Sequence, residues 1–298
     1  MLLVVADRFD PTVDEVADRL NAWGVPWFRF NVAEYPERIR IDWSLDGFRI
    51  RSESHKCRSE EIRSAWYRKP KPVRVSKELE ASHREFAENE ANQVIEGIYR
   101  LLDVLWFNDP LAIRQANNKL LQLRDAASLG FNVPRTLVTT EPKKAKEFVA
   151  QQASVAKSIY SPLVGNRVVF TQLIDSDEDF SSVRYAPVLF QEKIEKISDL
   201  RITVIGDDLV ACRIDSRELD WRVLDDPPLE LTELSQEFKE NCFALGDLYG
   251  LRLYVIDGAV DREGKEWFLE LNPNGQWGFI NVVYPVFDKV ARMLAEAC

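Results

Sequence analysis

The first hundred residues alternate between apolar runs and helical spacing. An uninterrupted apolar run near the N-terminus is the pattern of a strand that is buried on both faces. The pattern predicts a strand at residues 2–7, a helix at 10–24, a strand at 25–31, a hairpin at 39–52 and a strand within 62–70. Strands that alternate with a helix predict a small α/β domain.

A long amphipathic pattern follows between Leu79 and Leu105, where apolar residues recur at steps of three and four. It ends in the sequence WFNDP, in which Asn108-Asp109-Pro110 is both a helix stop and a new helix start. We therefore place the first domain boundary after residue 108.

The rest of the chain predicts two more domains, at residues 109–190 and 191–298, after the N-terminal domain of residues 1–108. The expected elements of the second are a helix at 109–130, a strand in 131–140, a Lys-rich helix in 141–152 and two strands within 154–174. Those of the third are a strand at 187–194, a hairpin at 200–215, a helix at 235–250, a hairpin at 251–272 and a helix at 283–298. The predicted fold class is therefore α/β with a mainly antiparallel C-terminal part (α+β).

Composition narrows the functional classes. The 298 residues contain no apolar run of the roughly 18 residues that a membrane-spanning helix needs. The apolar start lacks a basic region and is interpreted as a strand, not a signal peptide, so we expect a cytoplasmic protein. A net charge of −10 argues against nucleic acid or an anionic membrane as partner, because both need a positive surface.

The available side chains restrict the chemistry further. With two histidines and four scattered cysteines, neither a His- or Cys-based zinc site nor a Ser-His-Asp triad is expected. The P-loop, Rossmann and nucleophile-elbow motifs are also missing. An enzyme built from this sequence must therefore rely on carboxylates, Lys, Arg and a hard metal ion.

The last predicted hairpin places carboxylates on an apolar strand pair. If Glu263-Gly264 form a two-residue loop, Asp257 lies opposite Glu270, and Val255 lies opposite Asn272. One face then holds Asp257, Glu270 and Asn272, and the other holds Tyr254, Ile256, Trp267, Leu269 and Leu271. A three-residue loop would shift this pairing by one residue.

Two facing carboxylates repel each other, and their burial without a partner is costly. The oxygen atoms of Asp257, Glu270 and Asn272 suit Mg²⁺, which keeps its other positions for water and phosphates. Alternatively, the acids form salt bridges with nearby arginines, or their face is simply solvated.

Several segments in a fixed order resemble the ATP-grasp superfamily, and most closely its graspetide (microviridin-type) peptide maturases. They are WYRKP (66–70), residues 118–140, PVLFQEKI (187–194), ISDLRITVIGDDLVACRI (197–214) and ELNPNGQW (270–277). The resemblance implies an ATP-grasp fold with an N-terminal pre-ATP-grasp domain, a small central domain and a C-terminal antiparallel-sheet domain. It also implies ATP and Mg²⁺ as cofactors, with Asp257, Glu270 and Asn272 as the metal ligands.

The resemblance further assigns nucleotide-binding roles. Lys119 and Lys157 would contact the ATP phosphates, and the loop SPLVGNR (161–167) would cover them, although it has a single glycine where Gly-rich loops are usual. Adenine would be held by Gln191, Glu192 and Ile194, and the ribose hydroxyls by Asp199. The alternative for the two lysines is an ordinary surface role.

For the chemical step, the resemblance assigns charge stabilisation to Arg201 and Arg213, and contact with the acceptor or acyl phosphate to Arg222, with Asp220 beside it. Salt bridges to the many acids are the alternative role for these arginines. The expected reaction activates an Asp or Glu side chain of a precursor peptide as an acyl phosphate. A hydroxyl or an amine then closes an ω-ester or ω-amide macrocycle, and the sequence does not distinguish the two linkages.

The expected partners are a precursor peptide, comprising leader and core, and further copies of the chain in a homo-oligomer, expected as a dimer. The basic stretch at residues 68–74 and the helix with Lys143, Lys144 and Lys146 are candidate surfaces for an acidic peptide. Two other functions stay open: a ligase of free amino acids or short peptides, of the glutathione-synthetase or glutamate-ligase type, and a non-catalytic nucleotide-binding module.

Overall fold

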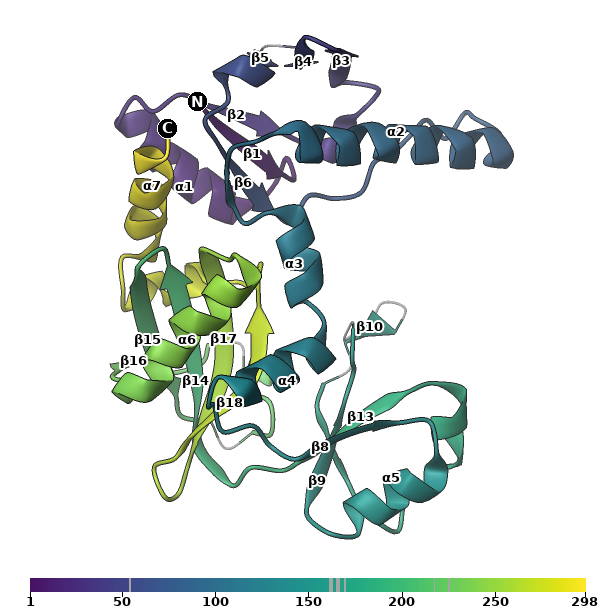
Figure 1. Cartoon of the computed structure of the whole chain (residues 1–298), viewed down its shortest axis with the longest axis vertical. Coiled ribbons are helices and arrows are strands. Elements are labelled where there is room, and N and C mark those ends of the chain that lie inside the picture. The colour runs from purple at the N-terminus through teal and green to yellow at the C-terminus, as the bar shows by residue number, and fades with distance from the viewer. Residues whose placement is uncertain (54, 161–162, 165–166, 169, 217, 225) are drawn as a thin grey trace. The chain divides into compact units, whose positions relative to one another are not determined.

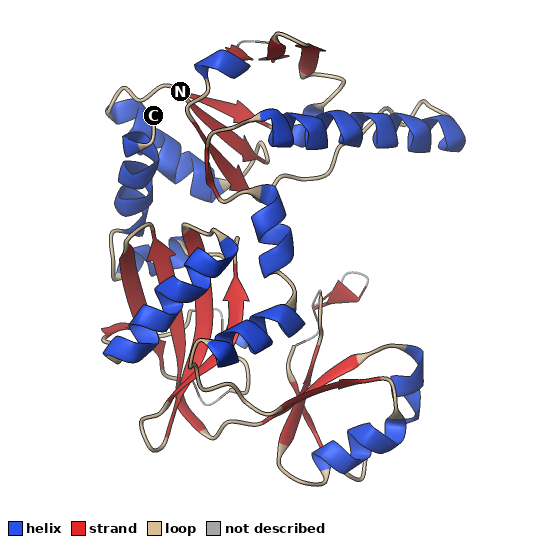
Figure 2. Ribbon diagram, in the orientation of Figure 1, coloured by secondary structure: helices blue, strands red, loops and turns tan. Residues whose placement is uncertain are grey.

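The computed structural model describes residues 1–53, 55–160, 163–164, 167–168, 170–216, 218–224 and 226–298, and among the strand residues 163–164 and 167–168 only the backbone. Helices and strands alternate along much of this chain (Figures 1 and 2). The chain forms two compact units. Unit 1 comprises Met1–Ile113, Gly250–Leu253 and Gln276–Cys298, and unit 2 comprises Arg114–Tyr249 and Tyr254–Gly275.

Unit 1 is built on a parallel sheet with the strand order β2-β1-β6-β7. Its strands are β1 (Leu2–Ala6), β2 (Trp27–Phe30), β6 (Ser64–Arg68) and β7 (Leu105–Phe107). All five residues of β1 are buried, which explains its uninterrupted apolar sequence, since a central parallel strand is covered on both faces.

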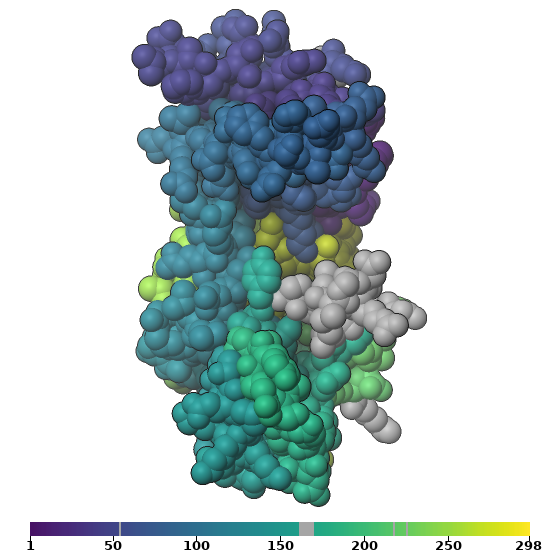
Figure 3. Space-filling view, turned by 90° about the vertical axis from the view of Figure 1, so that its right-hand side faces the viewer, coloured from purple at the N-terminus to yellow at the C-terminus, as the bar shows by residue number. Residues whose placement is uncertain are grey.

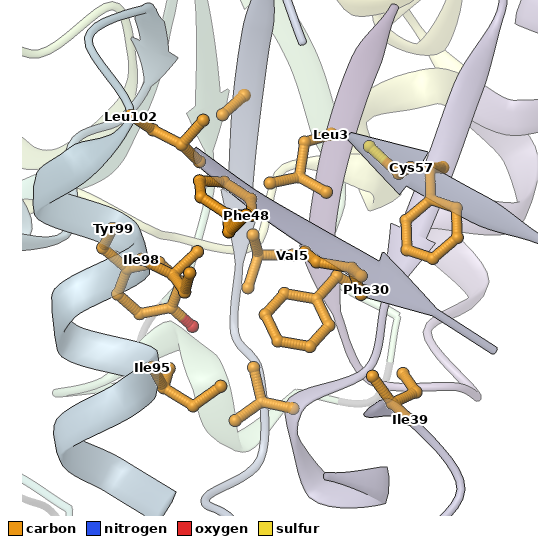
Figure 4. Packing of buried hydrophobic residues seen from close by; sticks show 14 of the residues in the cluster. Leu3, Val5, Phe30, Ile39, Phe48, Cys57, Ile95, Ile98, Tyr99 and Leu102 are labelled. Carbon is orange, nitrogen blue, oxygen red and sulfur yellow. The ribbon is translucent and has the colours of Figure 1, made fainter. Parts of the chain in front are cut away.

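Three helices belong to this sheet: α1 (Pro11–Ala22), α2 (Ala81–Leu101) and α7 (Val286–Glu296). Asp10 caps α1 by accepting hydrogen bonds from the Thr12 and Val13 amides, and α1 packs against α7. Leu3 and Val5 pack with Ile95 and Ile98 of α2 in one hydrophobic cluster (Figure 4). The helix α2 is long and blue in Figure 1, and its surface forms the blue bulge in the upper half of Figure 3.

A second, three-stranded antiparallel sheet in unit 1 has the order β3-β4-β5, from Arg40–Ser44, Gly47–Arg51 and Lys56–Arg58. Its buried residues Phe48, Ile50 and Cys57 join the same cluster as Leu3 and Val5, so one core serves both sheets. Short 3₁₀ turns occupy Val32–Glu34 and Ser59–Glu61.

Unit 2 contains a four-stranded sheet with the order β12-β9-β13-β8. Its elements are β8 (Thr136–Thr139), α5 (Pro142–Val149), β9 (Ser154–Lys157), β12 (Gln172–Ile174), a 3₁₀ turn at Ser181–Tyr185 and β13 (Val188–Glu192), with the short pair β10 (Leu163–Val164) and β11 (Arg167–Val168) beside them. Apolar side chains of α5 and β13, among them Ala145 and Phe190, form the core of this part.

The larger sheet of unit 2 is five-stranded, with the order β16-β15-β14-β17-β18. Its strands are β14 (Lys196–Ile205), β15 (Asp208–Ile214), β16 (Leu229–Thr232), β17 (Leu253–Asp261) and β18 (Glu266–Asn272). The helices α4 (Lys119–Ser128) and α6 (Gln236–Tyr249) also belong to unit 2, and α3 (Pro110–Ala116) begins in unit 1 and ends in unit 2. The helix α4 packs on β18 and α6, and a 3₁₀ turn lies at Trp221–Val223; a further 3₁₀ turn at Gly278–Val282 belongs to unit 1.

Two predicted elements were wrong in detail. The single helix expected at 109–130 is two helices, because the Asn118 side chain accepts hydrogen bonds from the Leu120 and Leu121 amides and starts α4 anew. The helix expected to reach Leu105 ends at Leu101, and Leu105 begins β7, which pairs with β6. The spacing of apolar residues predicts a longer helix in both cases, but a capping side chain in the first case and strand pairing in the second end it earlier.

The division into three domains stays a prediction beside these two units. No helix among the described residues is both long and apolar enough to cross a membrane.

Two helical glycines should respond oppositely to alanine. A methyl group at Gly246 of α6 would overlap the Tyr254 ring, whereas one at Gly97 of α2 would meet nothing within 4 Å. We expect Gly246→Ala to destabilise by about 1–3 kcal/mol through overpacking, and Gly97→Ala to stabilise by about 0.5–1 kcal/mol. Urea unfolding of the two variants beside the wild type measures this; a lowered midpoint for Gly97→Ala would contradict it.

Candidate active site

One pocket of unit 2 gathers most of the residues predicted to bind nucleotide and metal. The predicted residues that line it are Lys119, Lys157, Gln191, Glu192, Ile194, Asp199, Arg222, Asp257 and Glu270. They come from the start of α4, the ends of β9 and β13, the segment leading into β14, a 3₁₀ turn, and the facing strands β17 and β18. Segments far apart in the sequence therefore supply one cavity, as a ligand site requires.

The strands β17 and β18 place the two acids directly opposite each other. Asp257 pairs with Glu270, and Val255 pairs with Asn272, so the predicted register is confirmed. The loop, however, has three residues, since the Asp261 amide donates to the Lys265 carbonyl at 3.0 Å. A β-bulge between Asp257 and Gly258 absorbs the extra residue and keeps the acids in register.

The bulge also changes which side chains share a face with the acids. Leu269, predicted on the opposite face, lines the pocket beside Glu270, while Phe268 is fully buried in the core. Gly258 permits the close approach at the bulge, because a Cβ there would lie 2.8 Å from the Trp267 carbonyl oxygen. The prediction for Leu269 was therefore wrong.

Each acid has a cationic partner. Asp257 Oδ1 accepts a hydrogen bond from Arg201 Nη1 at 2.8 Å, and its Oδ2 accepts one from Asn272 Nδ2 at 2.8 Å. Glu270 Oε2 lies 3.3 Å from Lys119 Nζ. The salt bridges considered as an alternative to a metal are thus present, and they connect Arg201 and Asn272 to the pocket through Asp257.

This donor set still fits Mg²⁺. Asp257 and Glu270 are cross-strand neighbours that both line the pocket, and Asn272, which donates through its Nδ2, keeps Oδ1 for a cation. Among the described residues no group of three or more His, Cys, Asp or Glu side chains is placed to hold a metal ion. Such a sparse protein set suits Mg²⁺, which takes its remaining ligands from water and substrate phosphates.

Lys157 stands at the end of β9 with its Nζ donating to Gln191 Oε1 at 2.7 Å. Burial lowers the pKa of Lys157 to about 8, and the nearby positive charges of Lys119 and Arg222 act in the same direction, against the opposing charge of Glu270. When an anion binds beside such a lysine, it stabilises the protonated form, and the ammonium becomes fully charged. This is the behaviour expected of a phosphate-binding group.

The Gln191 side chain bonds to two neighbours within the protein. Its Oε1 accepts from Lys157, and its Nε2 donates to Thr136 Oγ1 at 3.0 Å. The amide therefore positions Lys157, and the predicted contact of Gln191 with adenine stays a prediction. Glu192 and Ile194 line the pocket at the segment between β13 and β14, where the Glu192 amide is bound to the Arg135 carbonyl.

Asp199 forms a buried ion pair that the sequence did not predict. Lys196 Nζ donates to Asp199 Oδ2 at 2.6 Å and to the Leu219 carbonyl at 3.1 Å. Burial raises the pKa of Asp199 to about 6, although Lys196 acts in the opposite direction. Lys196 thereby fixes the segment that carries Asp220 and Arg222 against the start of β14.

Arg222 and Asp220 form a bidentate pair, with Nε and Nη2 donating to the two carboxylate oxygens at 2.8 and 2.7 Å. These hydrogen bonds raise the pKa of Arg222, so its positive charge is permanent. Between them, Trp221 lines the pocket with Arg201 over its ring, 5.8 Å from the centroid. The turn thus presents one fixed cation to the acids Asp257 and Glu270.

Two of the predicted site features are not tested by this pocket. Arg213 is not among the pocket-lining residues of the described chain; its half-exposed guanidinium is bound to Asp215 at 2.6 and 2.7 Å. Its predicted role stays a prediction. The loop predicted to cover the phosphates, residues 161–167, lies largely outside the described residues.

Lys196 and Trp221 were not predicted from the sequence. The charge pair Lys196–Asp199 was visible as opposite charges three residues apart at a strand start. Nothing local marks Trp221, because its place depends on a contact with Arg201, twenty positions earlier.

Comparisons with known proteins agree with this geometry. A model of the RimK-like ATP-grasp domain matches residues 116–286, and a model of the MvdD pre-ATP-grasp domain matches residues 1–114. No curated protein sequence matches the chain. The chain belongs to the RimK-like ATP-grasp family, whose members are ATP-dependent ligases that use Mg²⁺. The resemblance, the fold class and the cofactors predicted from the sequence are thereby confirmed.

The chain is also similar to solved structures over its whole length. A Chryseobacterium gregarium RiPP-associated ATP-grasp ligase in complex with ADP and a leader and core peptide is 28% identical, with a TM-score of 0.92 over 100% of this chain and 97% of that one. The macrocyclase MdnC bound with precursor peptide MdnA, from Microcystis aeruginosa MRC, is 25% identical, with a TM-score of 0.89 over 99% of each chain. The macrocyclase MdnB from the same organism, 23% identical over 98% of each chain with a TM-score of 0.81, shows the same fold.

Lys157 should take up a proton when ATP binds. Below pH 8 the ammonium is already charged; above it, phosphate oxygens restore a charge that burial disfavours, so affinity falls as pH rises. Calorimetric titration at pH 8, in buffers that differ in ionisation enthalpy, should show proton uptake for the wild type and none for Lys157→Met. Equal uptake by both proteins would contradict the assignment.

Glu270→Gln should separate metal binding from a purely structural role. We expect the gain in ATP affinity that Mg²⁺ provides over EDTA to fall by about tenfold, because a hard charged ligand is lost. In EDTA the same variant should bind ATP at least as well as the wild type, because a negative charge is removed. Glu263→Gln, in the loop of the same hairpin, is the control and should change neither value.

Proposed function

We propose that the protein is a peptide ligase that activates Asp or Glu side chains of a ribosomal precursor peptide and links them as ω-esters or ω-amides. The observation that carries this is a pocket in which Lys119 and Lys157 stand beside the paired acids of β17 and β18, on a chain that aligns throughout with two structures solved with peptides. The site residues and their roles are part of the proposal.

The reaction has two displacements. A carboxylate oxygen of the substrate attacks the γ-phosphorus of ATP, the bond to the β,γ-bridging oxygen breaks, and ADP and an acyl phosphate form. A Thr or Ser hydroxyl, or a Lys amine, then attacks the acyl carbon; phosphate leaves and the nucleophile loses its proton. Neither step needs a histidine, and His55 and His83 are not among the residues that line the pocket.

The chain's own groups act mainly by position and charge. Lys119 and Lys157 bind the phosphates, and Arg201 and Arg222 offset the charge that develops on the transferred group. Mg²⁺, held by Asp257, Glu270 and Asn272, would add positive charge at the phosphates. Because Arg201 is held by Asp257 and Arg222 by Asp220, the cations are pre-organised, and little reorganisation is needed during the reaction.

The peptide partner, the cellular location and the oligomeric state are part of the same proposal. The peptide would comprise leader and core, the enzyme would work in the cytoplasm as a homodimer, and it would bind neither nucleic acid nor membrane. Light scattering of the purified protein measures the oligomeric state, and a monomer at working concentration would exclude the dimer.

The function is tested with the purified protein, ATP, Mg²⁺ and the short peptides encoded next to its gene. We expect ADP release and a peptide product lighter by one water per link, with no product from Glu270→Ala and normal product from Glu263→Ala. ADP release with free amino acids, and none with any peptide, would instead identify a ligase of the glutathione-synthetase or glutamate-ligase type. No turnover despite ATP binding would identify a nucleotide-binding module.

A further inference from the structure

A groove in unit 1 runs along the open edge of the parallel sheet. The strand β2 is the last strand of the described sheet, and its residues Trp27, Phe28 and Arg29 all line the groove, although the Phe28 side chain is buried in the core. Arg8, Asn31 and Arg38 also line this groove. A groove lined by consecutive residues of an edge strand follows the strand itself.

The backbone of β2 offers unused hydrogen-bonding groups to this groove. The Pro26 carbonyl accepts from the Leu2 amide at 3.0 Å, so by alternation Phe28 and Phe30 also turn their amides and carbonyls toward β1. The amides and carbonyls of Trp27 and Arg29 therefore point away from β1. They have no backbone partner among the described residues, and an incoming strand could pair with them.

Two buried polar side-chain atoms in the groove also lack partners. Asn31 is 6% exposed, and its Oδ1 forms no hydrogen bond within the described chain; the same holds for Arg29 Nε. An unsatisfied buried polar atom costs about 1–3 kcal/mol, so a pair of them in one groove indicates a missing ligand.

The charge of the groove favours an acidic ligand. Arg29 is held by Asp14 at 2.6 Å and by the Arg8 carbonyl at 2.8 Å, and Arg8 lies 3.4 Å from Glu34. Arg38 has no ion-pair partner within the described chain, which leaves its charge uncompensated. The lining carries three arginines against the two acids Glu34 and Glu53, and Asp14 pairs with Arg29 from outside the lining, so Arg38 is the cation left for a ligand, on a protein whose net charge is −10.

We infer that this groove binds an extended acidic peptide segment, which adds to β2 as a further strand. Its backbone would pair with Trp27 and Arg29, and its carboxylates would meet Arg8 and Arg38, with Asn31 binding a peptide or side-chain amide. This inference rests on the proposed function, in which the segment belongs to the precursor peptide outside the residues that become linked. The groove residues are distinct from those of the active-site pocket.

Hydrogen exchange tests the strand addition directly and needs no ATP. The probe is a labelled peptide of alternating Glu and Val residues, compared with its counterpart carrying Gln in place of Glu. We expect the Glu peptide to slow exchange at the Trp27 and Arg29 amides. The Phe28 and Phe30 amides, already paired with β1, serve as internal controls and should not change. Binding without protection of Trp27 and Arg29, or equal binding of the Gln peptide, would overturn the inference.

Charge reversal at Arg38 gives the second measurement. We expect Arg38→Glu to weaken binding of the Glu peptide by at least about tenfold, while Arg100→Glu, on the exposed surface of α2, leaves it unchanged. Equal affinities for Arg38→Glu and the wild type would overturn the inference, and circular dichroism confirms that each variant folds.

Catalysis separates this inference from the proposed function. For a precursor peptide that the wild type ligates, Arg38→Glu should raise KM at least about tenfold with little change in kcat, because binding and not chemistry is affected. An unchanged KM, in an enzyme that does ligate the peptide, would refute the groove alone. Protection of Trp27 and Arg29 by the Glu peptide, in a protein that ligates nothing, would uphold the groove and refute the proposed function.

Discussion

The direct pairing of Asp257 with Glu270 is the constraint around which the rest of the pocket is arranged. Adjacent antiparallel strands hold opposite side chains only about 4.5–5.5 Å apart, so two carboxylates in this position repel strongly unless cations intervene. Arg201 from β14 and Lys119 from α4 supply that charge. The neighbouring groups follow the same rule, since Asp220 is paired with Arg222 and Asp199 with Lys196. Alternating charges therefore account for the pocket's construction as well as for its affinity for a charged ligand.

This arrangement explains why a nucleotide and its metal suit the pocket together. ATP alone would place phosphates against two carboxylates, and a cation alone would compete with Lys119 and Arg201 for the same oxygens. Bound together they are nearly balanced, so the protein's ion pairs can be exchanged for new ones without leaving a buried charge uncompensated. The lowered pKa of Lys157 belongs to the same balance: burial disfavours its positive charge, and the nearby acids Glu270 and Asp220 only partly offset this until phosphates arrive.

The sequence predicted those parts of this site that depend on local period and strand pairing. Alternation and a turn signal placed Asp257 opposite Glu270, although the loop was assumed one residue too short. The register survived because the bulge after Asp257 compensates, and a bulge has no local signature beyond Gly258. Leu269 was misplaced because of that bulge, and Lys196 was overlooked although its charge pair with Asp199 is local. Trp221 was missed because its position is set by a contact with Arg201, twenty positions earlier. Asn118 was missed for a different reason: its capping bond competes with a helical period that looks continuous.

The edge position of β2 is likewise a feature that local sequence does not predict. Its sequence, WFRF, reads as an ordinary short strand, and nothing in it reveals that the strand lies at an edge, because edge position is a property of the whole sheet order. Exposed edges invite unwanted pairing, and β2 is short, which limits that risk. Within the described chain this edge has two residues with unpaired backbone groups, a buried asparagine whose Oδ1 lacks a hydrogen bond, and an arginine without an ion pair, so it is nevertheless more polar than a protected edge needs to be. A ligase acting on a long peptide gains from such a second contact. Holding one segment raises the effective concentration of the others, and this binding energy is available without altering the groups that perform the chemistry.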